Sequence, residues 1–157
     1  MSVLFTTEDL IVRRFEARDA AECLTWLADP DVMRYIEEPF DAEKCETFLR
    51  TNALIEEPRV HAVERKTDNR LIGHLIFHPF NDDDYELGWI LRRDAWHHSY
   101  ADQLTKGVIR LAEEKGIDSL IIECDKDQKA SIAIAEKNGF VRIGNDSDLL
   151  QYQRKRK

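Results

Sequence analysis

Glu86 lies in a short apolar segment, YELGWIL at 85–91, directly before a turn rich in cationic and aromatic side chains. A carboxylate in such a place has the chemistry of a general base, and like-charge repulsion from the acidic run 82–84 would make it a stronger one. An exposed glutamate on the polar face of a strand gives the same pattern. The residues alone leave both interpretations open.

The turn that follows, WHHSYA at 96–101, lies where a helix is predicted to begin, because apolar residues recur at helical spacing over 104–111. A helix N-terminus there points unpaired backbone N–H groups and the positive end of the helix dipole into the turn. Such a terminus is typical of phosphate binding. His98 would add a donor whose charge depends on pH, and His97 is interpreted as an exposed loop residue.

A second interpretation of this turn needs no ligand. Ser99 and Asp102 have the spacing of a capping box, in which side chains of the helix take the amides that a phosphate would use. A filled cap would leave a weaker anion site, so the two interpretations compete for the same N–H groups.

Length and composition favour one globular domain of 157 residues with an ordinary core. No apolar run reaches membrane-spanning length and no signal-peptide pattern is present, so we expect a cytoplasmic protein without membrane contact. The net charge of −8 disfavours nucleic acid as a partner. Three cysteines without CxxC spacing argue against a disulfide framework or a zinc site, and no metal is expected.

The elements that must position these residues alternate between strand and helix patterns, separated by Pro, Gly and Asn signals. Asp41 is the expected N-cap of the second helix, Pro58 its expected end, and Gly116 the expected end of the third. The predicted order β-α-α-β-β-β-α-β-α-β-β places strands at 10–15, 60–65, 71–77, 85–91, 119–124, 140–143 and 149–153, and helices at 17–28, 41–57, 101–115 and 130–137. This order predicts an α/β fold with a mixed sheet flanked by helices.

In this order, five segments resemble the GNAT superfamily of acetyl-coenzyme A-dependent N-acetyltransferases, in particular the branch that contains the ribosomal-protein N-terminal acetyltransferases. They are LIVRRFEARDA at 10–20, LIGHLIF at 71–77, YELGWIL at 85–91, WHHSYA at 96–101 and SIAIAEKNGF at 131–140. The resemblance implies a mostly antiparallel twisted sheet, one acetyltransferase domain over 1–157, and acetyl-CoA as the cosubstrate.

The resemblance also assigns the residues that would hold coenzyme A. The usual loop of the branch is Trp-Gly-Lys-Gly-Tyr-Ala, and here His97 and Ser99 replace its two glycines, which would reshape the phosphate cradle. An Asn that contacts the pantetheine arm in the family falls on Gln128, and the oxyanion donor is expected to be a backbone N–H at Ile90 or Leu91. The expected cofactor-binding set is Ile90, Leu91, Trp96, His98, Ser99, Tyr100, Ala101, Asp102 and Gln128.

The same resemblance assigns the catalytic pair. Glu86 stands where the branch commonly has the Glu of Glu-x-Gly-Tyr/Trp and is the expected base, acting directly or through water. Ser131 is the expected acid, since the Tyr that many members place one turn further on corresponds here to Ala135. Ser131 also fits the cap of a helix beginning near Ala130, and this alternative stays open.

The implied reaction is direct attack of a primary amine, on a peptide N-terminus or a small molecule, on the thioester of acetyl-CoA. A short connection at 145–148 would leave the acceptor side open or completed by a second subunit, and a homodimer follows from family analogy. The alternative is a GNAT-fold binding or regulatory protein that has lost efficient turnover, suggested by His97, Ser99, Gln128 and Ala135.

Overall fold

The computed structural model describes residues 2–146 and 148–157, and eight strands within them form one continuous sheet. The strands are β1 (Val3–Thr6), β2 (Leu10–Arg13), β3 (Val60–Arg65), β4 (Leu71–Pro79), β5 (Tyr85–Leu91), β6 (Ser119–Asp125), β7 (Val141–Asp146) and β8 (Leu149–Lys155). Their order across the sheet is β1-β2-β3-β4-β5-β6-β8-β7. Every neighbouring pair is antiparallel except β5 and β6, which are parallel.

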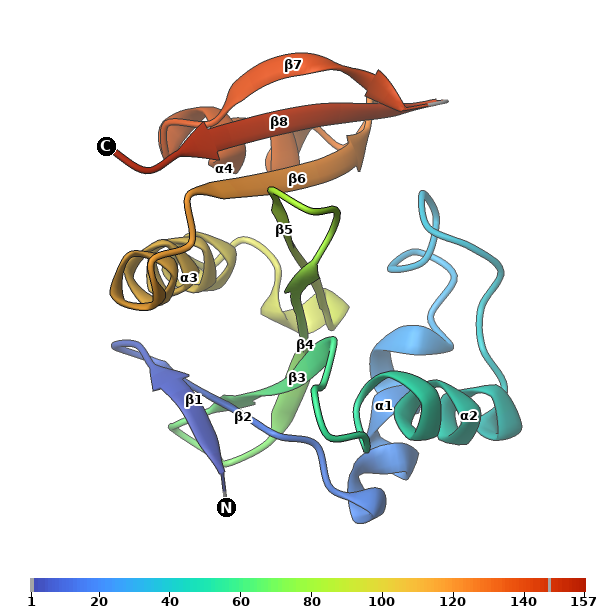
Figure 1. Ribbon diagram of the computed structural model, residues 1–157. Helices are drawn as coiled ribbons and strands as arrows, with labels where there is room; N and C mark the ends of the chain where they lie inside the picture. The colour runs from blue at the N-terminus through green and yellow to red at the C-terminus, as the bar shows by residue number, and fades with distance from the viewer. Residues whose placement is uncertain (1, 147) are drawn as a thin grey trace.

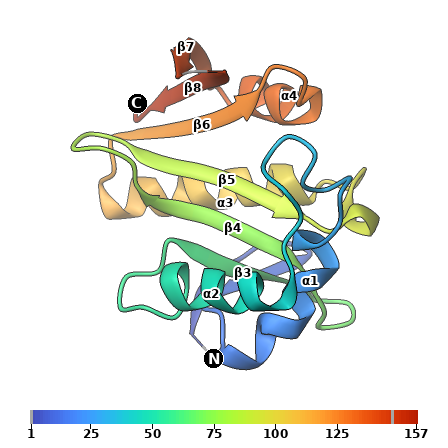
Figure 2. The same ribbon diagram turned by 90° about the vertical axis from the view of Figure 1, so that its right-hand side faces the viewer.

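Helices cover both faces of this sheet (Figures 1 and 2). They are α1 (Ala20–Leu27), α2 (Ala42–Asn52), α3 (Tyr100–Lys115) and α4 (Lys129–Lys137), with 3-10 turns at Ala17–Asp19 and Arg93–Ala95. In Figure 2, α1 and α2 lie in front of the sheet and α3 lies behind it. None of the helices in the described part of the chain is long and apolar enough to cross a membrane.

The core has two layers, one on each side of the sheet. Between the sheet and α3, the periodic residues Leu104, Val108 and Leu111 are buried, as their helical spacing predicted. Between the sheet and the pair α1 and α2, a second cluster includes Trp26 and Leu49, both nearly inaccessible. Each fully buried side chain of this size contributes about 1.5–3 kcal/mol relative to an exposed one, so both layers anchor the strands of the site.

The predicted α/β class, with a mixed and mostly antiparallel sheet flanked by helices, is confirmed. The predicted element order was wrong by one strand, because β1 precedes the predicted opening strand and pairs with β2. At four residues with little burial, β1 is too short for its periodicity to be read from sequence. The N-cap Asp41 is confirmed, since its Oδ1 accepts from the Lys44 N–H at 2.8 Å.

The end of α2 differs from the prediction. The helix stops at Asn52 rather than continuing to Pro58, and the Leu54 N–H turns back to the Leu49 carbonyl at 2.8 Å. The Asn52 carbonyl then accepts from the Arg59 N–H, which leads the chain into β3. Gly116 ends α3 in the left-handed conformation, φ 71°, as predicted. The connection expected at 145–148 includes Ser147, which lies outside the described residues.

Candidate active site

The sheet opens between β5 and β6. These strands pair at Tyr85 with Leu120 and at Glu86 with Ile121, and beyond Glu86 they diverge (Figure 2). A cleft of about 220 Å³ lies at this opening. Residues 86–90 of β5 and 122–124 of β6 line it, together with residues at the start of α4 and in the segment between α1 and α2.

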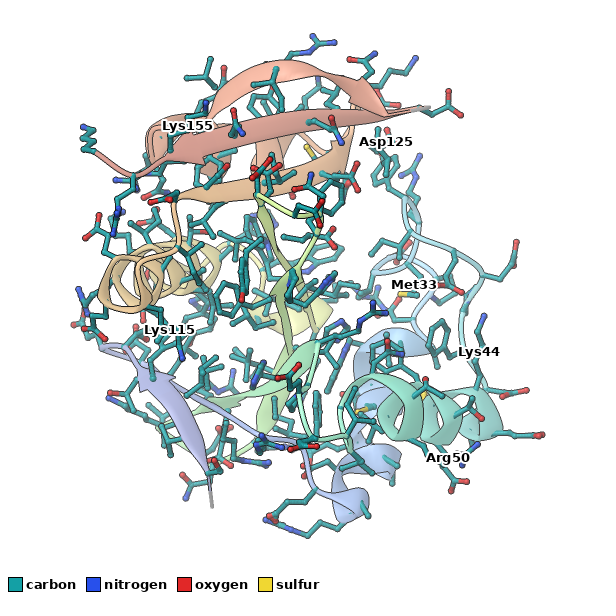
Figure 3. All side chains as sticks on the ribbon, in the orientation of Figure 1. Met33, Lys44, Arg50, Lys115, Asp125 and Lys155 are labelled. Atoms are coloured by element: carbon teal, nitrogen blue, oxygen red, sulfur yellow. The ribbon has the colours of Figure 1, made fainter. Side chains whose placement is uncertain are left out.

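The walls of the cleft come from distant parts of the chain. Figure 3 labels Met33 in the segment between α1 and α2, and Asp125 at the end of β6. Tyr35 and Ile36, just after Met33, line the cleft, as do Glu123 and Cys124, just before Asp125. The segment after α1 therefore completes a site whose floor is the diverging pair of strands.

Four of the predicted site residues meet in this cleft. Glu86, Ile90, Gln128 and Ser131 all line it, so the expected base, the expected acid and two expected cofactor contacts share one space. Leu91 lies in the core layer against α3 instead, with 6% of its surface exposed. The remaining predicted residues, from Trp96 to Asp102, lie in the turn beyond the end of β5 and in the first turn of α3.

Glu86 has a partner that the sequence did not indicate. His78 lies directly opposite it on β4, and its Nε2 is 2.9 Å from Glu86 Oε1. The hydrogen bond to Glu86 raises the pKa of His78 above its ordinary value, against the lowering effect of burial. Glu86 is thus a half-buried, paired carboxylate and not the exposed strand residue of the simpler interpretation.

Asp84, the last residue of the acidic run 82–84, has hydrogen-bond partners of its own. The carboxylate of Asp84 accepts hydrogen bonds from the Ser119 hydroxyl, the Asn81 amide and the Gln153 amide. These bonds hold the pKa of Asp84 below its usual range although burial alone would raise it. The carboxylate next to the strand is thus hydrogen-bonded to other residues, and the side chain paired with Glu86 is a histidine.

The start of α4 places Ser131 inside the helix. Gln128 is the N-cap residue, so Ser131 is the third helical residue, and the predicted capping role for its hydroxyl was wrong. Within residues 2–146 and 148–157, the structure shows no hydrogen-bond partner for this hydroxyl, which lines the cleft. Gln128 Oε1 accepts from the Asp125 N–H at 2.7 Å, which leaves the amide nitrogen of Gln128 as its donor end.

The turn before α3 keeps a backbone conformation typical of glycine. His97 has φ 64°, in the left-handed region that side chains rarely adopt, whereas Ser99 has an ordinary φ of −81°. His97 therefore stands at a position whose backbone conformation glycine adopts more easily. Trp96 Nε1 donates to the Leu91 carbonyl at 3.0 Å and ties the turn to the end of β5.

The capping box predicted at Ser99 and Asp102 does not form. Ser99 makes no side-chain cap bond, and its hydroxyl oxygen instead accepts from Gln103 Nε2 at 2.8 Å. The ring of His98 is exposed and stacks on Tyr100, the first residue of α3, with ring centroids 4.9 Å apart. The amides of the first turn of α3 are therefore not occupied by these side chains.

Asp102 points away from the turn and toward α4. Its carboxylate accepts from Lys106 at 2.6 Å, from Asn138 at 2.8 Å and from Lys137 at 3.2 Å. Burial alone would raise the pKa of Asp102, but these hydrogen bonds lower it to about 2. Two cations thus offset its charge, and the residue links α3 to α4 without repelling an anion at the helix N-terminus.

Sequence reasoning missed several residues of the site, among them His78, Tyr35, Trp89 and Glu123. Trp89 and Glu123 lie on segments that were predicted as strands. Which residues of these strands face the cleft depends on how β5 and β6 diverge. His78 was missed because its position opposite Glu86 follows from the register of β4 and β5. Tyr35 belongs to an irregular segment with no periodicity that sequence patterns can detect.

Comparisons with known proteins agree on one family. A family model described as an acetyltransferase (GNAT) domain matches residues 9–141. An uncharacterized N-acetyltransferase, YnaD of Bacillus subtilis (strain 168), is 28% identical over 142 residues, which cover 88% of this chain and 83% of that protein.

Solved structures agree on the fold. An acetyltransferase of the GNAT family from Bacillus anthracis superposes with a TM-score of 0.87 at 24% identity, covering 99% of this chain and 98% of that chain. The ribosomal L7/L12 alpha-N-protein acetyltransferase RimL, solved in complex with coenzyme A, superposes with a TM-score of 0.83 at 17% identity, covering 98% of each chain. At sequence identities this low, the two superpositions show that the fold is shared.

The family match spans most of the described sheet, from before β2 to the start of β7, and includes the turn before α3 and every lining residue of the cleft except Leu149. The expectations of a GNAT-like fold and of an acetyltransferase enzyme are thereby confirmed. The chain belongs to the GNAT family of acetyltransferases.

Proposed function

We propose that this protein transfers the acetyl group of acetyl-coenzyme A to a primary amine, on a peptide N-terminus or a small molecule, in the cytoplasm. One observation carries the proposal: the cleft where β5 and β6 diverge brings Glu86, Ile90, Gln128 and Ser131 together. The uncapped N-terminus of α3, reached through the turn at the end of β5, is the second part of the same site.

The residues fit coenzyme A at two places. The first-turn amides of α3 carry the positive end of the helix dipole and are free of side-chain caps, which suits a pyrophosphate. The left-handed backbone at His97 supports this use, because it is a conformation that glycine, the usual residue there by resemblance, adopts readily. The donor end of Gln128 would contact the pantetheine arm in the cleft, with Ile90 providing the backbone wall.

The reaction then needs one base, one electrophile and one proton donor. A cationic acceptor first loses one proton to solvent. The lone pair of the neutral amine then attacks the thioester carbonyl carbon while Glu86 takes a second proton from the nitrogen. The new C–N bond forms as the C–S bond breaks, and the departing thiolate takes a proton. Ser131 is the candidate for delivering that proton, because its hydroxyl lines the same cleft and can take a proton back from solvent as it gives one up.

The lining of the cleft favours a cationic acceptor with an apolar neighbouring group. Glu86 and Glu123 place two carboxylates in it, while Tyr35, Ile36 and Trp89 provide apolar and aromatic surface. A net charge of −8 adds long-range attraction for a cation. RimL, a structural neighbour, is named for acetylating a ribosomal protein at its α-amino group, which supports a peptide N-terminus among the acceptors.

Titration calorimetry with acetyl-CoA, followed by a thiol-release assay, tests the proposal. The acceptor panel is spermidine, benzylamine and hexapeptides beginning with Ser, Ala or Met. We expect acetyl-CoA binding and saturable thiol release with at least one amine. The absence of binding at about 1 mM acetyl-CoA, which means a binding free energy weaker than about −4 kcal/mol, would contradict the proposal. Binding without turnover on any amine would favour a regulatory GNAT-fold protein instead.

A further inference from the structure

His78 has a hydrogen-bonding contact at each nitrogen of its imidazole ring, one with Glu86 and one with Pro79. Nε2 lies 2.9 Å from Glu86 Oε1, and Nδ1 lies 2.7 Å from the carbonyl oxygen of Pro79. The carbonyl oxygen can only accept a hydrogen bond, and an ionised carboxylate can only accept as well. Both side chains are partly buried, with 17% of the His78 side chain and 23% of the Glu86 side chain exposed.

This geometry sets the number of protons on the pair. With one proton on each ring nitrogen, an imidazolium donates to both oxygens and faces an ionised Glu86. The removal of one proton leaves a lone pair facing an acceptor oxygen at one of the two contacts, which is unfavourable. The pair therefore titrates as a unit, and its proton affinity belongs to neither residue alone.

Other titratable groups surround this pair, and one of them, Arg59, acts on the pKa of His78. Arg59, which precedes β3, lowers the pKa of His78, whereas the hydrogen bonds to Glu86 and Pro79 raise it and outweigh both Arg59 and burial. Glu123 on β6 and Tyr35 before α2 line the same cleft as Glu86. Asp84 is held by Ser119 and Gln153 and does not compete for the histidine.

We propose that His78 is a positioning residue that forms, with Glu86, a two-residue proton acceptor for the acetyl transfer. This inference rests on the proposed function and names the residue that assists Glu86 as the base. In the active form the pair carries one proton fewer than the imidazolium–carboxylate form. The proton leaves the acceptor nitrogen as the C–N bond forms, is received by the Glu86 carboxylate and passes to His78 Nε2. Solvent later removes it.

The first test needs no acceptor. Protein labelled with ¹⁵N in its histidines is titrated by NMR, with wild type compared with Glu86→Gln. We expect the pKa of His78 to fall in Glu86→Gln, because the hydrogen bond to Glu86 is the main cause that raises it in wild type. Glu123→Gln is the matched control, because it removes the other carboxylate of the cleft without touching Nε2. A His78 titration that is the same in wild type and Glu86→Gln would overturn the pair.

The second test is the pH dependence of kcat/KM with acetyl-CoA and the best acceptor of the panel. In wild type, kcat/KM rises with pH through the titration of the pair. In His78→Gln the rising part of this pH profile moves to lower pH, because the imidazole that shares the proton of the pair is gone, and kcat falls by roughly 10-fold or more. A purely structural role would lower kcat without moving the rising part of the profile.

The two failures are distinguishable. Acetyl transfer with the same pH profile in wild type and His78→Gln would overturn the pair and leave the proposed function standing. If the His78 titration depends on Glu86 but no amine of the panel is acetylated, the proposed function is overturned, and the role of the pair as a base is overturned with it. The acetyl-CoA Kd of His78→Gln should stay within about twofold of wild type, a difference below about 0.4 kcal/mol.

Discussion

Gly73 on β4 and Ile90 on β5 approach so closely that a side chain at Gly73 has no room. A Cβ atom there would lie 2.1 Å from the carbonyl oxygen of Ile90 and 2.8 Å from the α-carbon of Leu91. Because Ile90 lines the cleft, this contact sets where the end of β5 stands relative to β6.

Gly73→Ala should therefore displace β5 at the cleft. We expect a loss of about 1–3 kcal/mol in the free energy of unfolding, because a backbone atom and not a flexible side chain must move. The affinity for acetyl-CoA should fall together with the free energy of unfolding. Gly144→Ala is the matched control, since Gly144 has the same φ of 156° but no atom within 4 Å of the added Cβ. Urea denaturation and calorimetry measure both effects, and equal losses in the two variants would contradict the steric account.

The left-handed backbone at His97 gives a second prediction. His97→Gly should retain acetyl-CoA binding, while His97→Val should weaken it and lower the free energy of unfolding by about 1–2 kcal/mol, because a β-branched residue is strongly disfavoured at φ 64°. Ser99→Gly should bring no gain in affinity, since φ at Ser99 needs no glycine. Tighter binding in Ser99→Gly than in His97→Gly would contradict this assignment.

Acid should destabilise the protein through two buried histidines. Burial lowers the pKa of His61 to about 4 and that of His74 to about 3. Below pH 6.5 the unfolded chain binds protons at both residues and the folded chain does not. The free energy of unfolding should then fall by about 1.4 kcal/mol per pH unit for each histidine between pH 6.5 and 4.

Variants separate the two histidines. Nδ1 of His61 is buried without a hydrogen-bond partner in the described structure, so His61→Leu should keep or raise stability at pH 7 and remove roughly half of the acid slope. His74 Nδ1 accepts from Trp26 Nε1 at 2.9 Å, so His74→Leu should cost about 1–3 kcal/mol at pH 7. Urea denaturation at several pH values measures this, and an unchanged acid slope in both variants would refute the assignment.

A buried ion pair near the N-terminus should dominate local stability. Arg13 lies 2.9 Å from Asp19 and 3.3 Å from Glu64, with 3% of the Arg13 side chain exposed. Asp19→Asn leaves the buried guanidinium without its main partner and should cost about 3–5 kcal/mol. Lys44→Gln breaks the half-exposed pair with Glu37 and should cost less than about 1 kcal/mol. Similar losses in the two variants would argue against a buried pair.

Local patterns were enough to predict the elements that carry the site. The strand Tyr85–Leu91 has the predicted bounds, and α3 has the predicted buried face and the predicted end at Gly116. These signals depend on residues that are close together in sequence. They are the alternation of apolar residues in the strand, and the helical spacing and final glycine of the helix. The cleft residues Glu86 and Ser131 were placed by family resemblance, which already reflects the three-dimensional arrangement of related proteins.

The partners of these residues could not be predicted in the same way. His78 meets Glu86 because the turn between β4 and β5 sets their register, and a shift of one residue would send the two side chains to opposite faces. Ser99 had two competing partners within one helical turn, and the Gln103 amide displaced the expected cap. The backbone of His97 stays left-handed although its side chain disfavours it, because the surrounding turn is fixed by Trp96 and α3.

The central claim is that the cleft between β5 and β6 carries out acetyl transfer with Glu86 as the proton acceptor. The most direct measurement is kcat/KM for thiol release in wild type and Glu86→Gln, with the acetyl-CoA Kd measured on both proteins. The account predicts a loss of about 10²–10⁴ in kcat/KM with Kd essentially unchanged, because general-base catalysis contributes on that scale. Equal kcat/KM values in the two proteins would contradict it.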